Sequence, residues 1–415
     1  MKQRYWQSAR ISVLVFISVF LSFAYISMTK MCFSASMVFI VSEGTMTKFE
    51  TGNIVSMFYV TYAILQVVGG FVVDKYPPER FITIGMVGAA VCNLLVYFNR
   101  NYVFVMIVWA LNGIVQFGVY PAVFKILTTM LKPEHRDLGL VLSGFSNPVG
   151  TLASYLVAAL VPHWRYNFLV SAIGLVAFGV IWEIVFAVSK RDLVTVETEV
   201  KRIETKSEES FGRLILRSGV WLFMIIGLIR GSFDNGFRSL TPTMIKECYD
   251  AVTPAFATIL STVVLVAGAF GTLSAHFLHV HVFKNEAKAL FALLCCAFPL
   301  VSVTLLVGRV HYVVLVIALA LFVWITGMAG FFSFSLISAR FGKWGRGGTL
   351  AGIFNALAAL GIVIANSIFT AIVEATSWFT TSVVWVCMML FIMALSAVLI
   401  RIWTRFIKKE FFTHH

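Results

Sequence analysis

The sequence predicts an all-α polytopic membrane protein with twelve transmembrane helices in two bundles of six. Of its 415 residues, 60% are hydrophobic and only 12% are charged, a balance that soluble globular domains do not have. Apolar runs of about 20 residues recur from end to end, and each is long enough to cross about 30 Å of hydrocarbon. The short alternating segments typical of a transmembrane β-barrel do not occur in the sequence.

The twelve predicted spans divide into two sets of six. They cover residues 11–40, 51–73, 81–99, 102–130, 138–160 and 166–188, and then 219–245, 253–280, 288–307, 311–336, 347–372 and 379–402. Between the two sets, acidic and basic side chains alternate, as in a solvated and partly helical linker. The sequence therefore predicts an N-terminal bundle (1–188), a cytoplasmic linker (189–218) and a C-terminal bundle (219–415).

The net charge of +13 is unevenly distributed between the loops. In a twelve-span count, the N-terminus, the linker, the C-terminal tail and all the strongly basic loops fall on one side. These loops lie near Lys75 and Arg80, Lys132 and Arg136, Lys284 and Lys288, and Arg340, Lys343 and Arg346. Because cytoplasmic loops carry the excess of Lys and Arg, both termini are predicted to be cytoplasmic, in a cytoplasmic (inner) membrane. The same pattern accounts for the basic charge without nucleic acid.

The seventh predicted span contains three charged residues at intervals of four, Arg230, Asp234 and Arg238. In a helix this spacing places them along one stripe, where Asp234 can pair with either Arg. One carboxylate cannot neutralise two guanidinium groups, so one positive charge remains. Charge at membrane depth is costly unless it faces a polar cavity, which predicts a functional site. For Arg238 the alternative is a position near the helix end, from which its side chain reaches the interface.

Two further cations lie inside predicted spans without an adjacent acid. Lys30 is deep, because the apolar run continues beyond it to Val41. Lys125 is nearer the cytoplasmic end of the fourth span, and it either faces a cavity or reaches the interface.

No motif for catalysis or cofactor binding stands out in the sequence. It has no nucleotide-binding loop, catalytic triad or metal-hydrolase motif, so we do not expect an enzyme. His276, His279 and His281 have a spacing that could ligate a metal, but no acidic or cysteine residue accompanies them. We therefore predict neither a metal nor another cofactor.

The loop between the second and third spans resembles a family signature. In GGFVVDKYPPER, the residues Gly70, Asp74, Lys75 and Arg80 resemble the Gly-x-x-x-Asp-Arg/Lys-x-x-x-x-Arg signature of the major facilitator superfamily, at the place where that family has it. The resemblance implies the major facilitator fold and a gating role for these four residues. The corresponding loop of the second half, AHFLHVHVF, lacks the expected acidic residue and has His279 near its place.

Within that superfamily, the chain looks most like the organophosphate:phosphate antiporter branch, which includes glycerol-phosphate and hexose-phosphate transporters. KMCF aligns with the Arg-Lys-Asn-Phe of that branch, TYAILQVVGGFVVDK matches its second span, and WALNGIVQFGVYPAVFK matches its fourth. Arg230, in contrast, lies four residues further from Pro242 than in the branch. From the charge pattern and the resemblance together, the predicted substrate-binding residues are Lys30, Tyr62, Tyr120, Lys125, Asn147, Arg230, Asp234 and Arg238.

The resemblance implies a monomeric secondary active transporter that exchanges a small organic anion, a phosphate ester, for inorganic phosphate by alternating access. Lys30 from one bundle and Arg230 from the other would hold the anion near the bilayer midplane. One alternative is a proton-coupled symporter of a sugar acid or other carboxylate, with Asp234 as the proton acceptor. Another is a transporter-like sensor of sugar phosphate. The expected partners are the anion, phosphate or protons as coupling species, and the lipid bilayer.

Overall fold

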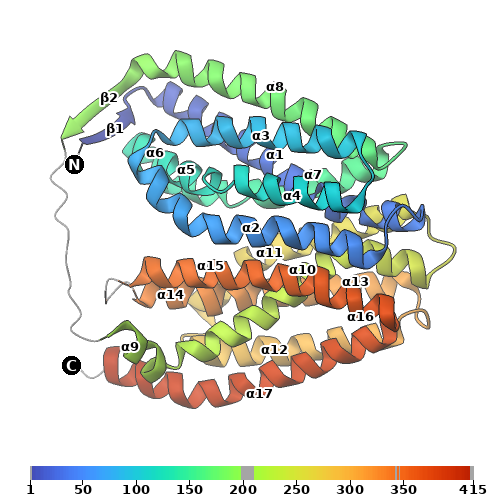
Figure 1. Cartoon of the computed structure of the whole chain (residues 1–415). Helices are drawn as coiled ribbons and strands as arrows, with labels where there is room; N and C mark the ends of the chain where they lie inside the picture. The colour runs from blue at the N-terminus through green and yellow to red at the C-terminus, as the bar shows by residue number, and fades with distance from the viewer. Residues whose placement is uncertain (1, 198–209, 342–343, 345, 412–415) are drawn as a thin grey trace. The chain divides into compact units, whose positions relative to one another are not determined.

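A computed structural model describes residues 2–197, 210–341, 344 and 346–411 (Figure 1). The chain forms two compact units. The first lies within residues 1–202 and 254–259, and the second within residues 203–253 and 260–415.

The first unit is a helical bundle. Its helices are α1 (Ala9–Ser42), α2 (Lys48–Lys75), α3 (Pro78–Phe98), α4 (Tyr102–Val115), α5 (Val119–Lys125), the π-helical segment η1 (Ile126–Met130), α6 (Pro133–Ser143), α7 (Ser146–Leu160) and α8 (Arg165–Ser189). Helix α1 packs on α7 and α8, and α2 packs on α4. A Cβ atom at Gly150 would lie 2.1 Å from the carbonyl oxygen of Ala24, so only glycine allows α7 to approach α1 this closely.

The second unit is also helical. It contains α9 (Phe211–Ser218), α10 (Val220–Cys248), α11 (Pro254–His281) apart from its first six residues, α12 (Glu286–Ser302), the 3-10 turn η3 (Val303–Leu306), α13 (Tyr312–Gly330), the π-helical segment η4 (Phe331–Ser335), α14 (Leu336–Phe341), α15 (Gly347–Val363), the π-helical segment η6 (Ile364–Phe369), α16 (Thr370–Ala375) and α17 (Trp378–Phe411). Helix α10 packs on α13, α15 and α17. It therefore contacts most of the bundle that surrounds the predicted charge stripe.

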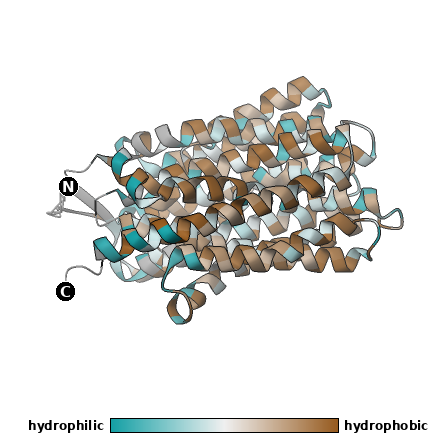
Figure 2. Ribbon diagram, turned by 90° about the horizontal axis from the view of Figure 1, so that it is seen from below, coloured by the Kyte–Doolittle hydropathy of each residue, from teal (hydrophilic) through white to brown (hydrophobic). Residues whose placement is uncertain are grey.

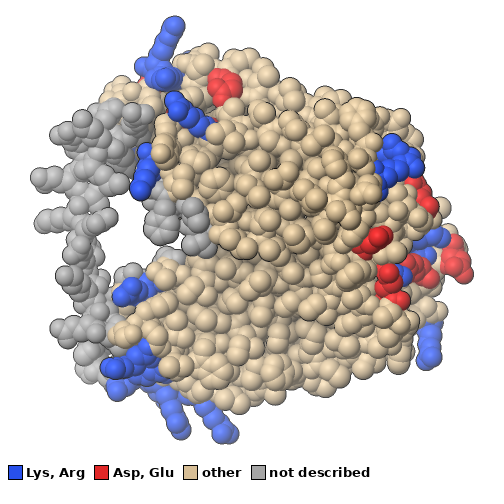
Figure 3. Space-filling view, in the orientation of Figure 1, with Lys and Arg blue, Asp and Glu red and all other residues tan. Residues whose placement is uncertain are grey.

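The helices have the length and hydropathy of membrane spans. Among the described residues, nine helices meet these criteria, or ten when α9 and α10 are taken as one bent span. Every one of the twelve predicted spans falls on helix. Two of them do not meet the criteria for a membrane span: the second, which is α2, and the fifth, which is the pair α6–α7 interrupted at Gly144 and Phe145. Hydrophobic residues cover the lengths of the helices, and most charged side chains gather at their ends (Figures 2 and 3). The predicted all-α polytopic membrane protein is confirmed.

A two-stranded sheet joins the N-terminal segment to the start of the predicted linker. Strand β1 (Lys2–Trp6) pairs antiparallel with β2 (Leu193–Glu197). Trp6 is buried, and its indole N–H donates to the carbonyl oxygen of Ser189 at 3.1 Å. The described parts of the predicted linker are therefore not simply solvated, because β2 belongs to the first unit and α9 to the second. Residues 198–209 of the predicted linker lie outside the described chain.

Candidate functional site

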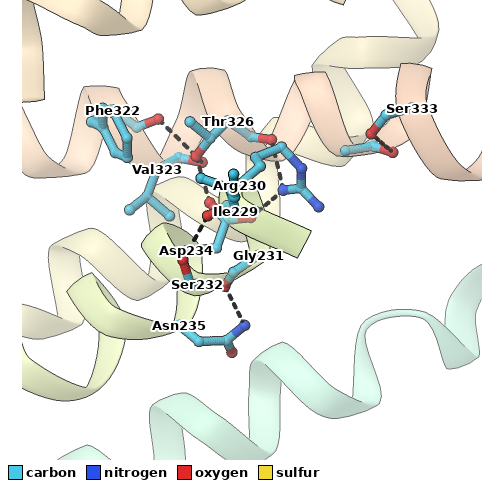
Figure 4. Close-up of polar contacts among 11 residues, drawn as sticks. Ile229, Arg230, Gly231, Ser232, Asp234, Asn235, Phe322, Val323, Thr326 and Ser333 are labelled. Atoms are coloured by element: carbon cyan, nitrogen blue, oxygen red, sulfur yellow. Dashed lines mark hydrogen bonds and ion pairs between the residues drawn. The ribbon is translucent and has the colours of Figure 1, made fainter. Parts of the chain in front are cut away.

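The charged stripe of the seventh predicted span lies on α10. Arg230 and Asp234 are both buried, with 6% and 8% of their surface exposed. One turn apart, they form an ion pair in which Nη1 of Arg230 donates to Oδ2 of Asp234 (Figure 4). Of the two arginines that could pair with Asp234 by spacing, Arg230 makes this contact.

Thr326 on α13 completes the network around this pair. Its carbonyl oxygen accepts a hydrogen bond from Nη1 of Arg230 at 3.0 Å, and its hydroxyl donates to Oδ1 of Asp234. Figure 4 shows these contacts converging between α10 and α13. Thr326 is 1% exposed, so both hydrogen bonds are shielded from water and are correspondingly strong. A single residue therefore fixes both members of the ion pair, although the sequence did not indicate it.

One edge of the Arg230 guanidinium is left without a protein partner. Its Nε atom is buried and has no hydrogen-bond acceptor among the described residues. The N–H groups along one edge of a guanidinium form a planar fork that matches two oxygens of a carboxylate or phosphate. Because Nη1 is held by Asp234 and Thr326, the edge that includes Nε remains available to bind an anion.

Two residues four and eight positions after Thr326 shape the space around the guanidinium. A Cβ atom at Gly330 would lie 3.0 Å from Cζ and from both Nη atoms of Arg230, so glycine provides the room that this group occupies. The ring of Phe334, in η4, has its centroid 5.3 Å from Cζ, within the range of a cation–π contact. These contacts keep the guanidinium in one orientation.

In the first unit, Lys30 is a second buried cation. It lies in α1, is 9% exposed, and has no hydrogen-bond or ion-pair partner among the described residues. Its Nζ atom is 4.5 Å from the ring centroid of Tyr62 and 5.8 Å from that of Phe23. The Tyr62 hydroxyl accepts a hydrogen bond from the amide of Gln66 at 3.3 Å. Aromatic faces attract an ammonium group but do not accept its three N–H bonds, so Lys30 can still bind an anion.

Helix geometry gives the depth of each cation along its own helix. Arg230 is ten residues from the start of α10, which corresponds to about 15 Å. Lys30 is twelve residues from the end of α1 at Ser42, which corresponds to about 18 Å. About 15 Å is half of a typical hydrocarbon core. That both cations lie near mid-depth of the bilayer stays a prediction.

The remaining predicted substrate residues have different environments. Arg238 is half-buried, and a Cβ atom at Gly268 of α11 would lie 2.6 Å from its Nη2 atom. Helix α10 continues for ten residues beyond Arg238, so Arg238 is not at the helix end, and its place in the binding site stays a prediction. Tyr120 is exposed, with its ring 6.0 Å from that of Phe23, and Asn147 is exposed in the first turn of α7.

Lys125, the last residue of α5, contacts the end of α2, where the gating signature begins. The ammonium of Lys125 donates to the carbonyl oxygen of Val73 at 2.6 Å, one residue before Asp74. Gly70 and Asp74 belong to the last turns of α2, and Lys75 ends that helix with an exposed side chain. Arg80 is exposed in the first turn of α3. The side chain of Asp74 is outside the described part, so the gating role stays a prediction.

Comparisons with known proteins identify relatives of the chain. The model of the Major Facilitator Superfamily matches residues 15–366. The membrane sensor protein UhpC of Salmonella typhimurium is 29% identical over 182 residues, which cover 43% of this chain and 40% of UhpC. A probable hexose phosphate transport protein of Chlamydia trachomatis is 25% identical over 181 residues, 43% of this chain and 39% of that protein. The matches thus span about two-fifths of the length of these curated relatives.

A solved structure with the same fold covers almost the whole chain. It is a bacterial homolog of the human lysosomal transporter Spinster, in an inward-facing and occupied conformation. The TM-score is 0.77 over 96% of this chain and 98% of that one, at 11% sequence identity. This similarity confirms the predicted fold class.

Proposed function

The chain belongs to the Major Facilitator Superfamily, and we propose that within it this chain transports a small organic anion by alternating access. The family confirms the predicted transporter class and agrees with the expectation that the chain is not an enzyme. As the specific substrate we propose a phosphate ester, exchanged for inorganic phosphate. The relative from Chlamydia trachomatis, which carries the name of a hexose phosphate transport protein, supports this choice.

The observation that carries the proposal is the pair of buried cations with unpartnered N–H groups. Desolvating a charge costs several kcal/mol unless a partner compensates it. Asp234 compensates one arginine, whereas neither Lys30 nor the Nε edge of Arg230 has an acceptor in the described chain. An anion is the partner that both groups lack.

The charge of the proposed site favours a phosphate ester over a monocarboxylate. Of the proposed substrate-binding residues, Lys30, Lys125, Arg230 and Arg238 carry four positive charges and Asp234 carries one negative charge, which leaves a net charge of about +3. A phosphate monoester carries about −1.5 to −2 at pH 7, whereas a carboxylate carries about −1. We propose that the dianion offsets this excess of positive charge, and that the repulsion among the cations without it discourages the empty carrier from crossing. Exchange then needs no nucleotide hydrolysis.

The proposal can be tested by exchange in proteoliposomes loaded with phosphate. Labelled external phosphate should enter, and glucose 6-phosphate or glycerol 3-phosphate should compete better than a sugar acid. Lys30→Ala and Arg230→Ala should abolish exchange with near-normal expression, whereas Arg309→Ala, at an exposed position, should leave it unchanged. Accumulation that requires an inward proton gradient and ignores internal phosphate would instead support the proton-coupled symporter of a carboxylate.

A sensor is the second candidate, because one relative is named a membrane sensor protein. A sensor needs to bind the anion but not to move it across the membrane. If phosphate esters raise the melting temperature of the purified protein while no counterflow occurs in proteoliposomes, the sensor is supported and the transporter is excluded.

A further inference from the structure

Helix α9 runs across the start of the membrane-spanning helix α10. The two helices are separated only by Gly219, and their axes differ by 76°. Gly219 has a φ of 77°, in the left-handed region that glycine adopts without strain. A Cβ atom there would also lie 2.8 Å from a side-chain carbon of Ile402 in α17. The sharp turn is therefore built into the sequence, and α9 leaves the direction of the span.

The faces of α9 differ in polarity. At about 100° per residue, one arc runs from Leu214 through Phe211 and Ile215 to Leu216, and Arg213 and Arg217 lie together in the remaining arc. The protein covers only the first part of the apolar arc, since Leu214 is buried whereas Leu216 is 69% exposed. The structure thus leaves an apolar side of α9 open, next to its basic side.

Neighbouring residues show the level at which α9 lies. Trp221, in the first turn of α10, is exposed, as are the basic residues Arg405 and Lys408 near the end of α17. Arg217 of α9 is fixed to the same end of α17, because it donates to Glu410 at 2.7 Å. Exposed tryptophan and basic residues at the ends of spans are typical of the interface between membrane and water.

We infer that α9 is an interfacial anchor whose partner is the lipid of the bilayer that α10 crosses. Leu216 and the adjacent side of the helix enter the boundary between headgroups and acyl chains, and Arg213 faces the phosphate headgroups and water. The anchor fixes the start of α10 at the membrane surface. It therefore also sets the depth of Arg230, about 15 Å further along α10. The inference does not depend on the identity of the transported anion.

The test places an environment-sensitive fluorescent amino acid in the full-length protein in lipid nanodiscs. A coumarin amino acid replaces Leu216 in one variant and Arg213, on the basic side, in the matched control. A lipid that carries a doxyl quencher near its headgroup should quench the fluorophore at 216 at least about twofold more than at 213. Aqueous iodide should give the opposite order.

Two outcomes would overturn the inference. If iodide quenches the fluorophore at position 216 as strongly as at position 213, this side of α9 faces water. If neither quencher acts at position 216, protein covers this side of the helix. Should the variant at 216 fail to fold, Gly212 offers a second position on the same side. A Cβ atom at Gly212 meets nothing within 4 Å, so the fluorophore can be placed there with the same expected order of quenching.

Discussion

Replacing Thr326 by Val tests whether its hydroxyl keeps the anion-binding edge of Arg230 free. The change preserves the branched shape of the side chain but removes the donor to Oδ1 of Asp234. A hydrogen bond to a charged group contributes about 1.5–3 kcal/mol. Without it, we expect the carboxylate of Asp234 to take a second N–H of Arg230, which occupies the fork that the anion needs. Apparent affinity should then fall about ten- to hundredfold.

The assay is phosphate exchange in proteoliposomes, measured as KM and maximal rate for wild type, Thr326→Val and Thr326→Ser. The serine variant retains the hydroxyl, so its KM should stay near the wild-type value, while the melting temperatures of both variants report on folding. If valine and serine give the same KM, whether normal or raised, the hydroxyl does not position Arg230 and the reasoning fails.

Three further predictions concern neighbouring and distant positions. Gly330→Ala should raise KM by crowding the Arg230 guanidinium, without lowering the melting temperature. The control is Gly352→Ala, where a Cβ atom meets nothing within 4 Å and KM should stay unchanged. Equal KM values in the two variants would exclude crowding as the cause. Asp234→Asn should lower affinity yet retain exchange that is independent of a proton gradient, because the carboxylate of Asp234 orients Arg230 through their ion pair. Loss of gradient-driven accumulation alone would contradict this. Asp74→Ala should slow turnover while thermal shifts show affinity within several-fold of wild type, and complete loss of binding in a folded protein would argue against gating.

The length of the apolar runs made the helical fold predictable, because few structures other than a spanning helix accommodate 20 such residues. Interruptions within spans were not predictable in the same way. The π-helical segments and the break at Gly144 and Phe145 depend on how neighbouring helices pack. Strand β1 was also missed, since its partner β2 lies about 190 residues away and neither strand has a long alternating pattern.

The candidate site shows the same limit of local reasoning. The spacing within one helix predicted that Asp234 pairs with either Arg230 or Arg238, and the structure shows the pair with Arg230. The apolar run around Lys30 predicted its place well inside a helix. Thr326 carries no comparable signal, because a single threonine in an apolar span usually bonds to its own helix. Lys125 was ambiguous for a similar reason: its acceptor is the backbone of Val73, which no side-chain pattern reveals.

The π-helical segment that follows Gly330 makes the surroundings of Arg230 sensitive to a change of one residue in chain length. A π turn holds about one residue more than an α turn, so it rotates the register of the following residues by about 100°. Phe334 lies within this segment and faces Arg230. Deleting the codon for Phe334 would restore a regular α-helix, with the residues on both sides of the segment kept in register. A single deletion, without any substitution, would thus remove an aromatic ring from beside the guanidinium and leave the neighbouring turns in place.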